Sequence, residues 1–354
     1  MVVRIALDHR TQYRYDRAVS LSAQEVRLRP AAHTRTLLEA YSLNVSPRHH
    51  TVKWQHDAYG NRLARLTFER PVRELTIDVR LVARMDAVNP FDFLVDERAQ
   101  RFPLVYDEDE RRALAPFLER EAAGGRLAPW LEATRARLAQ SATTTVDFMV
   151  ETNRAVAQDI RYETRMEPGV QSCEQTLREH RGSCRDSAWL LVQVLRHFDI
   201  AARFVSGYLV QLARGAARRS DSADFHAWCE AYVPGAGWIG MDATSGLLAA
   251  EGHIPLAYAA VPDGAAPVVG YADRSRANLS FDMRVTRIPR RRHPLADRPQ
   301  VLYPFRYRDA DNGRWRAAPR PAQLEEIELH YHEFELAGEA VVIPARKTAK
   351  GRGQ

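Results

Sequence analysis

The chain has 354 residues, of which 45% are hydrophobic, and its formal net charge is +6. That length allows two or three domains with buried cores. No run of about 20 apolar residues is present, so we expect no membrane-spanning helix and no membrane partner. The N-terminus lacks the apolar core of a signal peptide, which predicts a cytoplasmic location. The 3 cysteines are too few for a disulfide framework and fit a reducing compartment.

Arginine and lysine are concentrated in two segments, residues 284–293 and 346–352. Basic clusters of this kind can bind nucleic acid. No zinc-ligand spacing, RNA-binding aromatic pattern or helix-turn-helix signal accompanies them, so we interpret both as solvated surface and expect no nucleic-acid partner. Steep salt dependence of binding to DNA or RNA would contradict this interpretation.

The N-terminal residues have the pattern of a β domain. Apolar and polar residues alternate in short stretches such as 3–7 and 75–79, as they do in half-buried strands. A turn signal at 58–61 separates two further strands. We therefore predict a β-sandwich-like domain over residues 1–90.

Helical patterns follow the predicted β domain. Two of them, around 107–121 and 127–139, are separated by a pair of glycines and form a helical connector expected over 91–144. A third predicted helix covers 145–159 and begins the next unit.

The predicted catalytic core, residues 145–260, alternates helices and strands. A capping-box pattern at 172–175 begins a short helix that ends near Gly182. A longer helix runs from Cys184 to about Phe198 and has one apolar face. Strands are predicted over 202–210, 226–233 and 237–243, with an exposed polar loop at 211–224.

The remaining residues, 261–354, are predicted to form a C-terminal extension with fewer sequence signals. One strand is predicted over 279–288. The basic tail at 347–354 is expected to be disordered.

Cys184 lies in the string Gly-Ser-Cys-Arg-Asp at 182–186, which indicates a turn followed by the first turn of an apolar helix. A helix N-terminus carries roughly +0.5 of an elementary charge and unpaired N–H groups, which favour a thiolate and can bind an oxyanion. Alone, a cysteine at this position is more often structural than catalytic. Cys173 has the same position in the short helix before it but no partner motif. We interpret Cys173 and Cys229 as structural residues.

The two strands at 226–233 and 237–243 supply a base for the thiol. If their hairpin is symmetric about Pro234, His226 lies directly opposite Asp242, with Cβ atoms about 4.5–5.5 Å apart. A free cysteine is only a few per cent thiolate at pH 7, whereas a paired imidazole can hold it as a thiolate. We therefore predict Cys184 as nucleophile, His226 as general acid and base, and Asp242 as the carboxylate that orients the imidazole.

These residues carry a resemblance to the transglutaminase-like superfamily, within the papain-like cysteine hydrolase architecture. The matching strings are 182–186, 201–208, 226–228 and 237–244. The resemblance covers about 145–260, and residues 1–90 resemble the β domain that precedes this core in bacterial members. It implies an α+β fold, in which the cysteine-bearing helix packs on an antiparallel sheet, and thiol-dependent acyl transfer or amide hydrolysis. The family's nucleophile, histidine and aspartate fall on Cys184, His226 and Asp242.

The chain departs from the family pattern in three places. Ala243 follows the aspartate, where the family often has a proline, and we expect this change to be tolerated because the proline shapes a turn. Phe225 precedes the histidine, where smaller or polar residues are common. Residues 290–354 match nothing in the family, and bacterial relatives with this N-terminal domain often continue into a much longer C-terminal region.

A complete site of this kind also needs an oxyanion hole. The backbone N–H of Cys184 would supply one donor, and Tyr162 and Gln171 are both candidates for the second. The resemblance places aromatic residues near the acyl pocket. Trp228 and Trp238 are the candidates here, and core packing is the alternative role for both.

We expect no cofactor and no metal. Animal transglutaminases depend on calcium, but the sequence has no Asp-x-Asp-x-Asp-Gly loop. The pair His49-His50 and the group His330, His332 and Glu333 are weak metal-ligand patterns, and we do not interpret them as sites.

The sequence as a whole predicts a thiol acyl enzyme that acts on peptide or protein amides, with peptidase or amidase activity favoured over crosslinking. Nothing in the sequence separates hydrolysis from transamidation, because the outcome depends on whether water or an amine reaches the acyl-enzyme. A non-catalytic protein-binding module on the same fold is the alternative. All three triad residues are present, which favours the enzyme. The sequence carries no signal for the oligomeric state.

Overall fold

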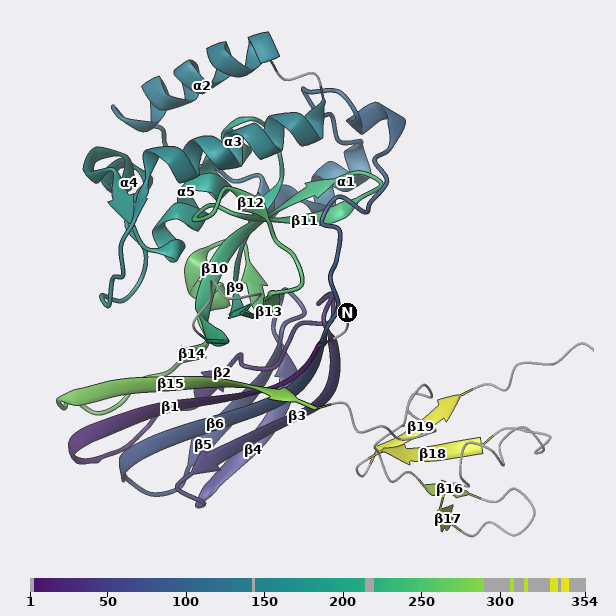
Figure 1. The fold of residues 1–354 in the computed structure, drawn as a ribbon. Helices are drawn as coiled ribbons and strands as arrows, with labels where there is room; N and C mark the ends of the chain where they lie inside the picture. Colours follow the sequence, from purple (N-terminus) through teal and green to yellow (C-terminus); the bar gives the residue numbers. More distant parts are fainter. Residues whose placement is uncertain are drawn as a thin grey trace, which may run out of the picture. The chain divides into compact units, whose positions relative to one another are not determined.

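The computed structural model describes residues 3–141, 144–213 and 220–289, together with four short strands between residues 306 and 343 (Figure 1). The chain divides into two compact units, residues 1–290 and 291–354. Among the described residues, no helix has both the length and the apolar composition needed to cross a membrane.

The N-terminal part of the first unit is a β-sandwich. Its strands are β1 Val3–Val19, β2 Gln24–Val26, β3 Leu37–Ser46, β4 His50–His56, β5 Arg62–Phe68, β6 Val72–Met85, β14 Val268–Val269 and β15 Ala277–Ile288. They form two four-stranded antiparallel sheets, ordered β15-β1-β6-β3 and β14-β2-β5-β4. Alternate apolar residues such as Leu7, Leu66 and Ile77 are buried in one core between them, as period-two patterning requires. The predicted sandwich-like domain is therefore confirmed.

Two strands of this sandwich come from late in the chain. β15 pairs along its whole length with β1, from Tyr15 opposite Ala277 to Arg4 opposite Ile288. β14 pairs with β2. Both N-terminal sheets are therefore completed by residues from the predicted C-terminal extension. The domain boundaries at residues 90 and 260 stay a prediction.

A helical region connects the sandwich to the core, with η1 Glu97–Ala99, α1 Glu108–Ala113, η2 Ala115–Phe117 and α2 Leu127–Ser141. α1 begins at a capping box in which Asp107 and Glu110 satisfy each other's backbone N–H groups. The helical stretch predicted around 107–121 is interrupted, because it contains α1 and the short 3-10 helix η2 and residues 118–121 lie outside both. Pro116 lacks an N–H and its ring clashes with the carbonyl four residues earlier, so the α-helix ends at Ala113.

The core contains α3 Thr145–Asp159, α4 Cys173–Glu179, α5 Cys184–His197, β7 Arg161–Tyr162, β8 Arg181–Gly182, β9 Ala202–Gln211, β10 Ser222–Val233, β11 Gly237–Asp242, β12 Leu247–Leu248 and β13 His253–Ala259. The strands β9 to β13 form one five-stranded sheet in the order β12-β11-β10-β9-β13, and every neighbouring pair is antiparallel. α5 packs on β9 and β10, and α3 and α4 pack on α5 (Figure 1). The cysteine-bearing helix therefore lies on an antiparallel sheet, as predicted.

The same sheet also contacts the N-terminal sandwich. Tyr208 of β9 and Ile254 of β13 belong to the buried cluster that includes Leu7 and Leu66 of the sandwich. Nδ1 of His9 lies 2.8 Å from the Tyr208 hydroxyl in this buried interface. The sheet that carries the predicted histidine and aspartate is thus supported on one side by the helices and on the other by the sandwich.

The register of the β10–β11 hairpin differs from the prediction. Val233 pairs with Gly237 and Cys229 with Met241, so the turn is centred on Gly235 and not on Pro234. Gly235 and Gly237 have φ angles of 84° and 74°, a backbone conformation that favours glycine.

The consequence of this shift for the site is small. A change of two residues keeps His226 and Asp242 on the same face of the sheet, because side chains alternate with a period of two. It makes them diagonal neighbours and not directly opposed residues.

The second unit contains one four-stranded antiparallel sheet ordered β17-β16-β18-β19, with β16 Arg306–Arg308, β17 Trp315–Ala317, β18 His332–Leu336 and β19 Glu339–Ile343. Several sequence predictions lie outside the described residues. These are the disordered tail, the basic segment 346–352, the end of the basic segment 284–293, and the side chains of His330, His332 and Glu333.

Candidate active site

Cys184 is the first residue of α5 and is half-buried. Ser183 before it is extended, with φ −77° and ψ 174°, so the chain enters the helix through a sharp change of direction. Gly182 fits here because a Cβ atom at this position would lie 2.9 Å from the Cβ of Asp186. The first-turn N–H groups of a helix have no acceptor within the helix, so the N–H of Cys184 is placed to bind an oxyanion.

The Asp186 carboxylate fixes the turn before Cys184. Its side chain has 0% exposure. One oxygen accepts from the Ser183 N–H, the Ser183 hydroxyl and Nε of Arg165, and the other accepts from the Gln171 N–H and Nη2 of Arg165. Burial alone would raise the pKa of Asp186, but the Arg165 guanidinium and these donors lower it below its usual range. The charged carboxylate therefore ties the loop at 165–171 to the start of α5.

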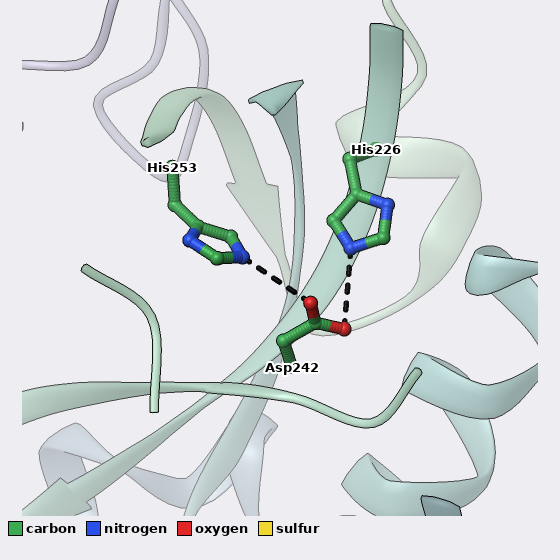
Figure 2. Close-up of side chains that lie close together, drawn as sticks. All are labelled: His226, Asp242 and His253. Atoms are coloured by element: carbon green, nitrogen blue, oxygen red, sulfur yellow. Dashed lines mark hydrogen bonds and ion pairs between the residues drawn. The ribbon is translucent and has the colours of Figure 1, made fainter. Parts of the chain in front are cut away.

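His226 of β10 and Asp242 at the end of β11 are brought together, as predicted (Figure 2). Nε2 of His226 lies 3.2 Å from Oδ1 of Asp242, and the two side chains are 8% and 4% exposed. The ring N–H is not aligned with that oxygen, and Nε2 has no hydrogen bond of acceptable angle. We therefore describe the contact as a buried ion pair, a geometry that often tightens only when substrate binds.

The thiol of Cys184 acts electrostatically on this group, since it is one of the contacts that raise the pKa of His226. Burial lowers the pKa of His226, but the contacts with Asp242 and Cys184 outweigh burial and raise it to about 9. The imidazole is therefore held in its charged form at neutral pH, where it can stabilise a thiolate.

Asp242 has more partners than the sequence predicted. Its Oδ1 also accepts the Thr244 N–H at 2.9 Å and the Thr244 hydroxyl at 2.7 Å. Its Oδ2 lies 3.4 Å from Nε2 of His253, the first residue of β13 (Figure 2). Burial would raise the pKa of Asp242, but the contacts with the two histidines and Thr244 lower it well below its usual range. The carboxylate is therefore charged throughout the physiological pH range.

Trp228 packs against both histidines. It is 1% exposed, and its ring lies parallel to His226 and edge-on to His253, at centroid distances of 6.4 and 5.2 Å. Gly207 of the adjacent strand makes room for it. A Cβ atom there would lie 2.5 Å from the Trp228 ring and 2.3 Å from the Ile254 carbonyl oxygen. The glycine and the tryptophan of the sequence motif thus fit together in the sheet.

The other predicted site residues are placed as follows. Tyr162 pairs with Gly182 in the short β7–β8 ladder and is 54% exposed, which leaves its side chain near the Cys184 turn. Gln171 is buried, and its side-chain oxygen accepts from the Thr176 hydroxyl. Trp238 packs on Tyr232 and lies over the guanidinium of Arg203. Both oxyanion candidates therefore stay predictions.

The remaining two cysteines have different surroundings. Cys173, the first residue of α4, is 3% exposed, and its thiol lies 3.8 Å from Oε2 of Glu121. Burial, together with the Glu121 carboxylate, raises the pKa of Cys173 above its usual range. Burial also raises the pKa of Cys229, which is 0% exposed.

His226, Asp242 and His253 also form a possible metal-ligand set, since their ligand atoms lie within 4.8 Å of one another. The hydrogen bonds do not fit a metal. Nδ1 of His253 accepts the Ala250 N–H at 3.3 Å, and a neutral imidazole has only one acceptor nitrogen. Nε2 of His253 therefore carries the proton and donates to Asp242, so it has no lone pair for a metal ion.

His253 is a member of this side-chain cluster that the sequence did not predict. It lies 11 positions after Asp242, on a strand that the sequence did not predict, and its only local signal is a histidine at the start of an apolar stretch. Its approach to Asp242 depends on the pairing of β13 with β9, which is a long-range feature.

A thiol at the start of a helix, packed on an antiparallel sheet that carries a histidine and an aspartate, defines a papain-like core. Residues 132–243 match the family model of the transglutaminase-like superfamily. Residues 5–84 match the model of the bacterial transglutaminase-like N-terminal region. The chain therefore carries a transglutaminase-like core at residues 132–243, preceded at 5–84 by the N-terminal region found in bacterial members of that superfamily.

Relatives of similar sequence occur in mycobacteria. An uncharacterized protein from Mycobacterium leprae is 26% identical over 294 residues, which are 80% of this chain and 99% of that protein. An uncharacterized protein from Mycobacterium tuberculosis is 23% identical over 295 residues, 81% of this chain and 93% of the relative. These matches extend over both the N-terminal region and the core.

A solved structure has a similar fold. The crystal structure of a candidate cysteine protease from Cytophaga hutchinsonii superposes with a TM-score of 0.61 at 18% identity, covering 82% of this chain and 92% of that one. At this identity the likeness shows the shared fold and leaves the reaction to be argued from the site.

Proposed function

We propose that this protein is a thiol-dependent acyl enzyme that cleaves amide bonds in peptides or proteins. Cys184 is the nucleophile, His226 the general acid and base, and Asp242 the carboxylate that holds the imidazole. One observation supports this most strongly. The buried His226 imidazole lies 3.2 Å from the Asp242 carboxylate, and this carboxylate and the half-buried Cys184 thiol at the start of α5 together raise the pKa of His226 to about 9.

The first half of the reaction forms a thioester. The Cys184 thiolate attacks the amide carbonyl carbon, and the carbonyl electrons move to oxygen, which faces the N–H of the α5 first turn. The C–N bond then breaks as the His226 imidazolium gives its proton to the leaving nitrogen. The products are the acyl-enzyme and a free amine or ammonia.

The second half releases the acyl group. Water gives a proton to the neutral His226 imidazole as its oxygen attacks the thioester carbonyl, and the C–S bond breaks to regenerate the thiolate. The charged carboxylate of Asp242 stabilises the imidazolium that reforms. A primary amine in place of water gives transamidation by the same proton transfers.

We favour hydrolysis over crosslinking, and the proposal extends to two further points. The proposed substrate is a peptide or protein amide, and the half-buried nucleophile is partly open to solvent. A cytoplasmic location stays a prediction from the N-terminal sequence.

A chromogenic ester tests the acyl-enzyme without knowledge of the natural substrate. Mix the protein with p-nitrophenyl acetate, stop the reaction with acid, and locate the acetyl group by peptide mass mapping. We expect acetyl thioester on Cys184, which decays in water and decays faster with cadaverine if amines reach the site. The His226→Gln variant should accumulate little of it, and Cys173→Ala serves as the matched cysteine control.

The alternative function is a non-catalytic binding module on the same fold. It predicts that Cys184 in the folded protein is acylated no faster than a cysteine in the unfolded chain. That outcome, in a protein that melts cooperatively, would contradict the proposed enzyme.

A further inference from the structure

The carboxylate of Asp242 is held from both sides, and the two sides differ. On one oxygen it faces His226 and accepts two hydrogen bonds from Thr244. On the other oxygen the hydrogen-bonded contact is with His253, at 3.4 Å. Because the Asp242 side chain is only 4% exposed, loss of His253 would leave a buried carboxylate oxygen without this donor.

The hydrogen bonds of His253 define its protonation. The Ala250 N–H donates to Nδ1 at 3.3 Å, so Nδ1 carries no proton. Nε2 must then carry one, and it points at Oδ2 of Asp242 (Figure 2). His253 is thus a neutral donor, whereas His226, on the other oxygen, is charged.

The turn that carries His253 is itself rigid. The His253 N–H donates to the Ala250 carbonyl at 2.9 Å, and the Val210 N–H donates to the Gly252 carbonyl at 2.8 Å. A Cβ atom at Gly252 would lie 2.5 Å from the Val210 carbonyl oxygen, so the close approach of this turn to β9 requires glycine. The edge of the Trp228 ring packs against the imidazole.

The N-terminal part of the chain also holds this turn. The hydroxyl of Thr36 donates to the Glu251 carbonyl at 3.1 Å, and the Val88 N–H donates to the Glu251 carboxylate at 3.4 Å. A chain of contacts therefore leads from the N-terminal β domain through Glu251 and His253 to Asp242.

We propose that His253 is a positioning residue of the active site: a neutral Nε2–H donor that fixes the second oxygen of Asp242, so that the first oxygen stays directed at His226. This inference rests on the proposed thiol chemistry and adds a fourth residue to it. His253 acts through Asp242 and does not touch the reacting atoms.

The other groups around Asp242 determine what the loss of His253 would do. In the described part of the chain, the groups that face Asp242 are His226 on β10, His253 on β13 and Thr244 after β11. The Cys184 thiol of α5 acts on His226. Without His253, the carboxylate turns away from the imidazole to satisfy its free oxygen. The imidazolium then loses support, and a higher pH is needed to form the thiolate beside it.

A spectrum of the wild-type protein tests the tautomer directly. Long-range ¹H–¹⁵N correlation of the histidine side chains at pH 7 distinguishes neutral Nε2–H, neutral Nδ1–H and imidazolium forms, and the His253→Gln spectrum assigns the signal. We expect the neutral Nε2–H form. An imidazolium or an Nδ1–H form at His253 would overturn the proposal.

Two substitutions test the effect on the site. His253→Leu removes the donor, whereas His253→Gln keeps an N–H donor of similar reach, and His50→Leu in the sandwich controls for loss of an unrelated histidine. The readout is the rate of Cys184 alkylation by iodoacetamide between pH 5 and 10, with thermal unfolding measured in parallel. A structural role alone would change the unfolding temperature without moving the pH midpoint.

We expect the midpoint of His253→Leu to move up by about one pH unit, which lowers the rate at pH 6 by roughly tenfold and leaves the rate at pH 9 nearly unchanged. His253→Gln should stay close to the wild type. An unmoved midpoint in His253→Leu, or an equal shift in both variants, would overturn the proposal.

The same experiment separates this inference from the proposed function. If wild-type Cys184 shows no enhanced alkylation and no dependence on His226, the thiol chemistry itself fails. If wild-type Cys184 shows enhanced alkylation that depends on His226, but His253→Leu behaves like the wild type, only the positioning role of His253 fails.

Discussion

Two helices of this protein begin in the same way, and only one of them begins at the proposed site. α4 and α5 each start with a cysteine that follows an extended serine, Ser172 or Ser183. In α4 the thiol is buried and faces the Glu121 carboxylate, and in α5 it is half-buried and faces the His226 imidazole. The backbone position is shared, so the difference in chemistry comes from the neighbours.

The neighbours act in opposite directions. Burial and a negative charge disfavour a thiolate at Cys173, and both raise its pKa. At the other helix, the imidazolium of His226 offers a positive charge that favours a thiolate. A helix start therefore provides the setting for a reactive cysteine, and a partner on another element decides whether the thiol is used.

The largest predicted effect comes from removing that partner. In His226→Gln we expect alkylation of Cys184 by iodoacetamide at pH 6 to fall about 100-fold, toward the rate of a free thiol. The pKa of His226 is raised to about 9, so the charged form is complete below its usual value of 6.5 and is lost as the pH rises through about 9. The ratio of wild-type to variant rate should therefore shrink toward 1 above pH 9.

The control for this variant uses the cysteine at the start of α4. Cys173→Ala should leave the alkylation of Cys184 unchanged at every pH. A loss of Cys184 reactivity in Cys173→Ala that equals the loss in His226→Gln would mean that the start of α4, and not β10, governs the thiol.

A second effect, on stability, is predicted for the carboxylates that hold the two helix starts. Asp186→Asn leaves Arg165 without its buried anion, and we expect it to lower the free energy of unfolding by about 3 kcal/mol. Glu174→Gln is the matched change in α4, where the carboxylate accepts N–H groups of Gly124, Arg126 and Leu127, and we expect about 1 kcal/mol. Urea denaturation at pH 7 measures both.

The contribution of Asp186 to the free energy of unfolding decreases at low pH. The folded pKa of Asp186 is lowered, so its contribution is complete above the unfolded value of about 3.9 and is lost as the pH falls through the folded value. Equal destabilisation by Asp186→Asn and Glu174→Gln would show that the start of α5 is held no more firmly than the start of α4.

Local patterns in the sequence predicted two helices of the core and the shared face of His226 and Asp242. The helix predicted over 145–159 matches α3, and the helix predicted from Cys184 to about Phe198 matches α5 with its cap residue. Both have clear N-terminal signals and apolar faces with helical spacing. The prediction that His226 and Asp242 share one face was right despite the wrong register, because a shift of two residues leaves every side chain on the same face of the sheet.

Features that depend on distant pairing could not be predicted in this way. β15 pairs with β1 across more than 250 residues, and no local pattern encodes that choice of partner. The hairpin register was wrong by two residues because the turn uses Gly235 and Gly237 in positive-φ conformations, and the sequence pattern indicated only Pro234-Gly235. His253 was missed because its contact with Asp242 requires the β13–β9 pairing to be known first.

The most direct measurement compares Cys173 and Cys184 in the same wild-type molecule. The folded protein is treated with a limiting amount of iodoacetamide at pH 6, and the alkylated fraction of each cysteine is followed over time by peptide mass mapping. The structure predicts that Cys184 is alkylated at least about 100-fold faster than Cys173, which is buried beside Glu121. Equal rates for the two cysteines would contradict the assignment of Cys184 as the nucleophile.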